Sequence, residues 1–288
     1  MGMSRFYDCH GHIFMDGGDH IEAFGRLKRF GVSYFRDGGD ADGRTAEAAR
    51  YAKEHFDELG IEYVTPVFAI HRKGRYGKIV GKPYENMKEY RDLVDEAKAK
   101  GADFIKLMFS GIATFKVFGG LSCEPLSEEE IKELVNIAHG EGFSVMAHVN
   151  GAETVKAAVR AGTDSIEHGL YLDDECIDIM AESDSVWVPT LTAIAAFSGR
   201  CGMNRNVRYA PRPGFDPDVS IRTIEDHMDS VRKGASKGVR IAAGSDSGAF
   251  GTPHGSATLS EYGLLMECGL SAESIITANE LIRGRFRR

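Results

Sequence analysis

Two histidines separated by a single residue stand near the start of the chain, in the segment Asp8-x-His10-x-His12. Residues two apart on a β-strand point to the same side of that strand. The two imidazoles are therefore expected to project together, about 6.6 Å apart on a strand that rises about 3.3 Å per residue. That spacing lets both imidazoles bind one metal ion. Surface strands also carry paired histidines, so the pattern gains weight only from further metal-binding side chains.

Four such side chains follow or lie within apolar, strand-like segments. They are Lys106, His148, His168 and Asp246. Burying an ammonium is costly, so Lys106 belongs to an exposed edge strand, to a buried ion pair, or to a site where burial lowers its pKa and leaves a reactive amine. A lone histidine at a strand end is more often structural than functional. The joint pattern, rather than any one residue, indicates a metal site.

Short apolar or β-branched segments alternate with helix-like stretches along the whole chain. The expected strands are residues 6–13, 32–37, 62–70, 104–109, 144–149, 165–168, 186–191 and 240–244, and the expected helices are 45–59, 87–100, 127–141, 152–161, 174–182 and 221–237. Strict alternation predicts parallel pairing. Eight such units favour an α/β fold, a (β/α)8 TIM barrel forming a single domain over residues 1–288. An open doubly wound sheet is the alternative, although no G-x-G-x-x-G follows the first strand.

A barrel predicts where the candidate ligands meet. The carboxyl ends of its strands share one face, and barrel active sites lie on that face. The candidates belong to the first, fourth, fifth, sixth and eighth expected strands, and imidazole and carboxylate groups suit zinc and related divalent ions. The expected fold therefore gathers six side chains at one mouth: His10, His12, Lys106, His148, His168 and Asp246.

The chain resembles the amidohydrolase superfamily of metal-dependent hydrolases, most closely its imidazolonepropionase- and prolidase-like branch. The similar segments occur in the order of the branch's strands and are residues 31–37, 147–153, 161–169, 188–191 and 243–247. The resemblance extends from His10 to about Asn279. Most relatives also have a small β-sandwich built from both chain ends. Because only five residues precede the first expected strand, the barrel is expected to lack that accessory domain.

The resemblance implies a role for each of the six side chains. His10, His12 and Asp246 would hold one divalent ion, His148 and His168 would hold a second, and Lys106 would be carboxylated to a carbamate that bridges the two ions, with zinc as the expected metal. A metal-bridging hydroxide would attack a carbonyl carbon, and Asp246 would carry the proton to the leaving nitrogen. The implied reaction is hydrolysis of an amide C–N bond in a small molecule, either dipeptide-like or a cyclic amide.

Two departures from the family pattern and three alternatives remain open. Many relatives have a histidine where this chain has Asn150, and many have Thr-Gly-Gly where this chain has residues 109–111. Hydrolysis of a lactone or ester is an alternative on the same metal site. A mononuclear deaminase is disfavoured because deaminase relatives typically have glutamate at the position of Gly151 and lack the lysine. A non-catalytic barrel predicts broken ligand positions, and all six are intact.

Several residues near the expected mouth are candidates for substrate binding. Arg36 ends the second strand and is expected to grip a substrate carboxylate or to pair with a neighbouring aspartate. The other candidates are His71, Asn150, Tyr171 and His254. Residues 199–218 form the longest irregular segment, and it is expected on the same face.

Composition excludes several other classes of function. The net charge of -8 gives no basis for a nucleic-acid surface, and no apolar run approaches the roughly 20 residues of a membrane helix. The five cysteines are scattered and never form C-x-x-C, which predicts free thiols in a reducing cytoplasm. The expected partner is therefore a small-molecule substrate, and a homo-oligomer is left open.

Overall fold

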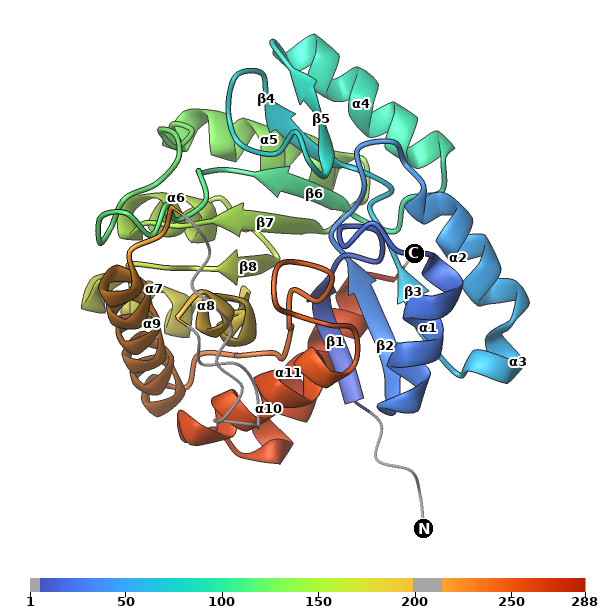
Figure 1. The fold of residues 1–288 in the computed structure, drawn as a ribbon. Helices are drawn as coiled ribbons and strands as arrows, with labels where there is room; N and C mark the ends of the chain where they lie inside the picture. The colour runs from blue at the N-terminus through green and yellow to red at the C-terminus, as the bar shows by residue number, and fades with distance from the viewer. Residues whose placement is uncertain (1–5, 199–213, 288) are drawn as a thin grey trace.

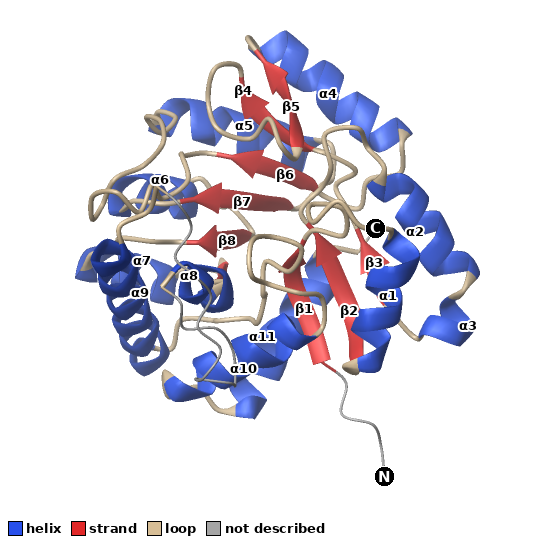
Figure 2. Ribbon diagram, in the orientation of Figure 1, coloured by secondary structure: helices blue, strands red, loops and turns tan. Residues whose placement is uncertain are grey.

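The computed structural model describes residues 6–198 and 214–287, and its strands lie at the centre with the helices arranged around them (Figure 1, Figure 2). Each strand is short and each is followed by at least one turn or helix. The strands are β1 (Phe6–Gly11), β2 (Val32–Asp37), β3 (Glu62–Val64), β4 (Ala69–Arg72), β5 (Gly81–Tyr84), β6 (Ile105–Met108), β7 (Val145–Val149), β8 (Ser165–His168) and β9 (Val186–Val188).

The helices cover the outside of the strands, as Figure 2 shows. They are α1 (His20–Arg29), α2 (Thr45–Glu54), α3 (Phe56–Leu59), α4 (Met87–Ala99), α5 (Glu128–Gly140), α6 (Ala152–Arg160), α7 (Asp174–Glu182), α8 (Leu191–Phe197), α9 (Pro217–Lys237), α10 (Ser256–Glu267) and α11 (Ala272–Arg285). The expected loop over residues 199–218 lies mostly outside the described residues.

All named strand pairs are parallel, in the orders β1-β2-β3 and β5-β4-β6-β7-β8-β9. The single strand expected over residues 62–70 is divided into β3, which pairs with β2, and β4, which pairs with β6. Val67 lies between them with a φ of 67°, a left-handed conformation that interrupts the extended backbone. The N–H of Asp103 donates to the carbonyl of Thr65 at 2.9 Å, which joins the two sheets on this side.

The eighth expected strand, residues 240–244, joins the sheets on the other side without being a regular strand. The N–H of Ala242 donates to the carbonyl of Trp187 in β9, and the N–H of Cys9 in β1 donates to the carbonyl of Ala243, both at 2.8 Å. The N–H of Ala243 donates instead to the Asn279 side-chain oxygen of α11, also at 2.8 Å. A side chain therefore replaces one bond of the expected ladder, and the strands close into a ring.

Local sequence signals explain most helix boundaries. Ser127 caps α5, where its side chain accepts from the N–H of Glu130, as capping serines do. The expected helix over residues 45–59 is wrong in one respect: it breaks at His55, whose φ of -105° leaves the helical region, so α2 and α3 are separate.

Apolar side chains fill the space between strands and helices, and Trp187 is the largest fully buried one. Among the buried polar side chains, His227 places Nε2 2.8 Å from the carbonyl oxygen of Pro189. Among the described residues, no helix is both long enough and apolar enough to cross a membrane.

Replacing Asn279 by alanine is expected to destabilise the ring at its side-chain link. The variant leaves the N–H of Ala243 buried without its acceptor and removes the bond from Asn279 Nδ2 to the Tyr262 hydroxyl. An unsatisfied buried group costs about 1–3 kcal/mol, so the free energy of unfolding in urea should fall by about 2 kcal/mol. Asn136→Ala, on the exposed face of α5, is the matched control, and equal losses in the two variants would contradict this role.

Candidate metal centre

One cavity collects all six candidate ligands at the carboxyl ends of the strands. His10, His12, Lys106, His148, His168 and Asp246 all line it. Each of these side chains is buried by the surrounding protein except Asp246, which is partly exposed. The six positions span the chain from residue 10 to residue 246, so the cluster exists only when the strands are assembled.

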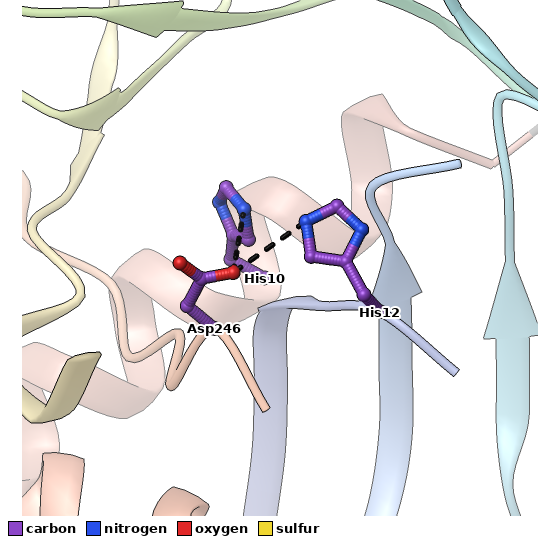
Figure 3. Close-up of side chains that lie close together, drawn as sticks. All are labelled: His10, His12 and Asp246. Carbon is purple, nitrogen blue, oxygen red and sulfur yellow. Dashed lines mark ion pairs between the residues drawn. The ribbon is translucent and has the colours of Figure 1, made fainter. Parts of the chain in front are cut away.

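His10, His12 and Asp246 form the tightest group. The Oδ1 atom of Asp246 lies 3.6 Å from Nε2 of His10 and 3.5 Å from Nε2 of His12, and Figure 3 shows this oxygen directed at both imidazoles. One ligand atom from each of the three residues falls within 4.8 Å of the other two. Side chains this close, with lone pairs converging, have the spacing of a metal-binding group.

His148 and His168 lie beside this group. The ring centroid of His168 is 4.9 Å from that of His10 and 4.7 Å from that of His148. The four imidazoles are thus contiguous, from β1 through β8 to β7.

Lys106 points its amine into the same cavity from β6. Its side chain is 2% exposed, and Nζ has no hydrogen-bond partner among the described residues. Burial lowers the pKa of Lys106 to about 8, because desolvation penalises the ammonium. A buried, unpartnered amine requires an explanation that a simple core position does not give.

Backbone and side-chain acceptors fix which nitrogen each histidine presents. Nδ1 of His10 lies 2.6 Å from a Glu167 oxygen, and Nδ1 of His12 lies 3.4 Å from the carbonyl oxygen of Gly39. Nε2 of His148 lies 3.2 Å from the carbonyl oxygen of Gly111. Because these oxygens accept, each contacting nitrogen carries the proton. His10 and His12 therefore present Nε2 to the cavity, and His148 presents Nδ1. In metal-binding histidines, a hydrogen bond to the other ring nitrogen fixes the tautomer in the same way.

The backbone is strained at the end of β8 and at two further residues near the cluster. His168, Thr190 and Asp246 have φ values of 64°, 52° and 54°, in the left-handed region that non-glycine residues seldom adopt. Nδ1 of His168 is 2.7 Å from the Thr190 hydroxyl, so Thr190 orients the imidazole of His168. Such strain persists where the surrounding structure enforces it, and here it lies at the cluster.

Burial also sets the protonation of the imidazoles. It lowers the pKa of His12 and of His148 to about 3 and that of His10 and His168 well below the usual range, and the Lys106 ammonium adds to the effect at each. The four rings are therefore neutral near pH 7 and keep a lone pair free, which is the state that metal ligands need.

Asp8, the first residue of the opening motif, supports the loop that carries Asp246. Its buried carboxylate accepts from the N–H of Ser245 at 2.9 Å and from the Thr258 hydroxyl at 2.6 Å. Burial raises the pKa of Asp8. This residue is a structural anchor beneath the cluster and does not line the cavity.

Arg36 corrects one of the substrate-binding expectations. Its side chain is 0% exposed and lies in the interior of the barrel. The guanidinium donates to Glu167 Oε1 at 2.8 Å, to the Ser165 hydroxyl at 2.8 Å and to the carbonyl of Cys9 at 2.6 Å. Arg36 therefore pairs with neither a neighbouring aspartate nor a substrate carboxylate. Arg36 positions Glu167, which in turn contacts Nδ1 of His10.

The remaining expected substrate contacts separate into two kinds. Asn150 lines the cavity, and its Nδ2 donates to the carbonyl of Gly111 at 3.1 Å. His71 and His254 are buried with backbone partners, His71 at the carbonyl of Arg72 and His254 at that of His12. These two and Tyr171 are absent from the described lining of the cavity, so their contact with substrate stays a prediction.

Three residues beside the cluster were not foreseen from the sequence: Glu167, Thr190 and Tyr76. The ring of Tyr76 lies 4.9 Å from that of His148, and the residue lines the cavity. Burial raises the pKa of Tyr76, so its phenol stays protonated and able to donate. Glu167 precedes His168 directly, and that adjacency was the one available signal.

The donor set fits a divalent metal centre. Four neutral imidazoles and a carboxylate converge with an unpartnered amine, and outer acceptors already orient the rings. Imidazole and carboxylate ligands are those of zinc and similar ions.

Comparisons with known proteins agree with this fold. Residues 6–279 match the family model described as the amidohydrolase family. An uncharacterized protein of Mycobacterium tuberculosis is 30% identical over 186 residues, covering 64% of this chain and 47% of that protein. The ochratoxinase of Aspergillus niger is 29% identical over 200 residues, covering 68% of this chain and 39% of that enzyme. The chain thus spans less than half the length of these relatives.

Solved structures show the same fold. A Xaa-Pro dipeptidase with bound methionine superposes with a TM-score of 0.74 at 24% identity over 96% of this chain and 75% of that one. The A. niger ochratoxinase gives 0.73 at 22% identity over 99% and 72%. The predicted TIM-barrel fold class is confirmed. With its family match running from β1 into α11, this chain belongs to the amidohydrolase family.

Proposed function

We propose that the protein is a metal-dependent hydrolase that cleaves an amide C–N bond of a small molecule. The observation that carries the proposal is the convergence of four neutral imidazoles, the Asp246 carboxylate and the unpartnered Lys106 amine in one cavity. A non-catalytic barrel would gain no stability from burying these six polar side chains together. Membership of the amidohydrolase family supports the same reaction class.

In this proposal the cluster would hold two divalent ions, with zinc as the expected metal. His10, His12 and Asp246 would hold the first ion, and His148 and His168 would hold the second. Lys106 would serve both ions as a carbamate, because an ammonium has no lone pair to offer while a carbamate has two oxygen ligands. The neutral amine that CO2 requires is available because burial lowers the Lys106 pKa to about 8.

The chain's own groups move the protons. When bound, the ions lower the pKa of a coordinated water and polarise a carbonyl. Burial raises the pKa of Asp246, and its carboxylate would take up a proton from the attacking water and release it to the leaving nitrogen. The protonated Tyr76 phenol faces the same cavity as a hydrogen-bond donor for the substrate carbonyl.

The substrate is proposed to be dipeptide-like or a cyclic amide. Similar proteins include a Xaa-Pro dipeptidase and an ochratoxinase, and the former's name implies a dipeptide substrate. A lactone or ester is the second candidate, because the same water attacks either carbonyl. No feature of the described residues favours deamination.

Asp246→Asn tests the proton-transfer role. The amide keeps a ligand oxygen but does not accept a proton, so turnover of a dipeptide or N-acyl amide panel should fall at least about a hundredfold while most metal is retained. Metal content by mass spectrometry and turnover are measured on the same preparation. Asp178→Asn, at an exposed position on α7, is the matched control. Near-normal turnover in Asp246→Asn would refute the role.

Lys106→Ala tests the bridging ligand. The variant should lose most of its metal and activity, and acetate or propionate should restore part of both by standing in for the carbamate. Protein incubated with ¹³C-bicarbonate should show a carbamate carbon by NMR that the variant lacks. Lys88→Ala, at an exposed site on α4, should keep all these properties. Full metal content in Lys106→Ala would show that the lysine is not a ligand.

Thr190→Val tests the orientation of His168. The change keeps the side-chain shape but removes the hydroxyl 2.7 Å from His168 Nδ1, and loss of such a partner typically weakens metal binding about 10- to 100-fold. Zinc affinity is measured by competition with a chelator. Thr192→Val is the matched control, since its hydroxyl contacts the carbonyl of Ala257 and the carboxyl of Glu261, which are not candidate ligands. Equal affinities in the two variants would contradict this orientation role.

A further inference from the structure

Away from the metal-binding candidates, the wall of the cavity is apolar. Its described lining includes Met15, Ile79, Ile112, Phe115, Phe197 and Phe250. Apart from the six candidate ligands, Tyr76 and Asn150 are the polar side chains of that described lining. A substrate group that binds along this wall leaves water and contacts apolar side chains.

Three phenylalanines form a row along this wall. The rings of Phe115 and Phe197 stack with centroids 4.6 Å apart and planes at 27°, and those of Phe197 and Phe250 stack at 5.7 Å and 23°. Phe115 is buried while Phe250 is 39% exposed. The row therefore runs from the interior of the cavity to its rim, and it offers a continuous aromatic surface.

The inner end of the row is held in a strained conformation. Phe115 has a φ of 51°, which a bulky side chain adopts only when its surroundings enforce it. Its carbonyl accepts from the N–H of Asp216, the N-cap of α9, at 2.9 Å. Phe115 also lies in the connection that follows β6, the strand of Lys106. The same segment that ends the lysine strand thus places an aromatic ring in the cavity.

The rim of the cavity is apolar and open to solvent. Ile79 is 68% exposed and Ile112 is 38% exposed, and both line the cavity together with Phe250. Exposed apolar groups that gather at one place mark binding surfaces. Because this surface is continuous with the wall that leads to the metal-binding candidates, the occupant that it fits is part of the substrate.

We propose that the substrate carries an uncharged, apolar group of at least aromatic-ring size that lies along Phe115, Phe197 and Phe250 while its carbonyl reaches the metal-binding cluster. The proposal rests on the proposed amide hydrolysis and narrows its substrate class. Peptides with small or charged side chains at this position are poor substrates, and amides with an aromatic or long aliphatic group are good ones.

Binding of hydroxamates to zinc-loaded protein tests this without turnover. Acetohydroxamate, hexanohydroxamate and phenylacetohydroxamate share one metal-binding head and differ only in the apolar group, and their affinities are measured by calorimetry. Each buried methylene is expected to tighten binding about fourfold. The hexanoyl and phenylacetyl compounds should therefore bind at least about tenfold more tightly than the acetyl compound.

Alanine variants of the phenylalanine row test whether these side chains cause the tighter binding of the larger compounds. Phe197→Ala should lower the affinity of the hexanoyl compound more than that of the acetyl compound and so remove most of the difference between them. Phe250→Ala, at the partly exposed end of the row, should remove part of the difference. Phe56→Ala is the matched control, because this phenylalanine is exposed on α3 and does not line the cavity.

The outcomes separate the two proposals. Equal affinities across the series overturn the apolar site while leaving metal-dependent hydrolysis intact, and tighter binding of the monohydroxamate of succinate than of hexanohydroxamate overturns the uncharged character. If no hydroxamate binds, the metal-dependent function fails. Saturation-transfer NMR with acetamide, hexanamide and phenylacetamide then decides the apolar site alone.

A second copy of the chain is the competing occupant of the rim. In that case light scattering shows a dimer that Ile79→Ser dissociates, and the hydroxamate series is flat. That result overturns the substrate proposal.

Discussion

Six ionisable side chains share one largely buried cavity, where a charged side chain costs free energy. This cost determines which hydrogen-bond acceptors the surrounding residues must provide. Desolvation keeps the imidazoles neutral and draws the Lys106 amine toward its neutral form. A neutral imidazole still has one N–H to satisfy, and buried N–H groups need acceptors. Glu167 and the carbonyls of Gly39 and Gly111 provide them. The arrangement of the surrounding barrel follows from these demands.

The sequence indicated the cluster because each ligand lies at or near the end of a recognisable strand, and the ends of parallel strands meet on one face. It indicated the fold because strand and helix alternate regularly. Neither signal depends on a contact between distant residues. The strand over residues 62–70 was expected to be continuous, although Pro66 in its middle is a local signal of the break that the left-handed Val67 makes.

The contacts that orient the cluster could not be foreseen in the same way. Arg36 is next to Asp37 and four residues from Asp40 in sequence, yet its partner Glu167 comes from β8 on the opposite side of the barrel. Glu167 and His168 are adjacent, and regular strand geometry would point them to opposite faces. His168, with its positive φ, lines the cavity, while Glu167 contacts Nδ1 of His10. Such long-range pairings and strained turns depend on the assembled barrel and leave little local trace.

The ring closes between the first strand and a segment more than two hundred residues later, and this has a consequence for biosynthesis. Asp246 binds back to β1, where its N–H donates to the carbonyl of His10 at 2.7 Å. Contacts of such sequence separation form late, because the intervening chain must first be ordered. A nascent chain that has emerged only as far as β9 carries all four histidines and the lysine but lacks the carboxylate that completes the tightest group. The tightest group of candidate ligands is therefore complete only after Asp246 has been synthesised, and a chain stalled before that point exposes an incompletely paired sheet edge.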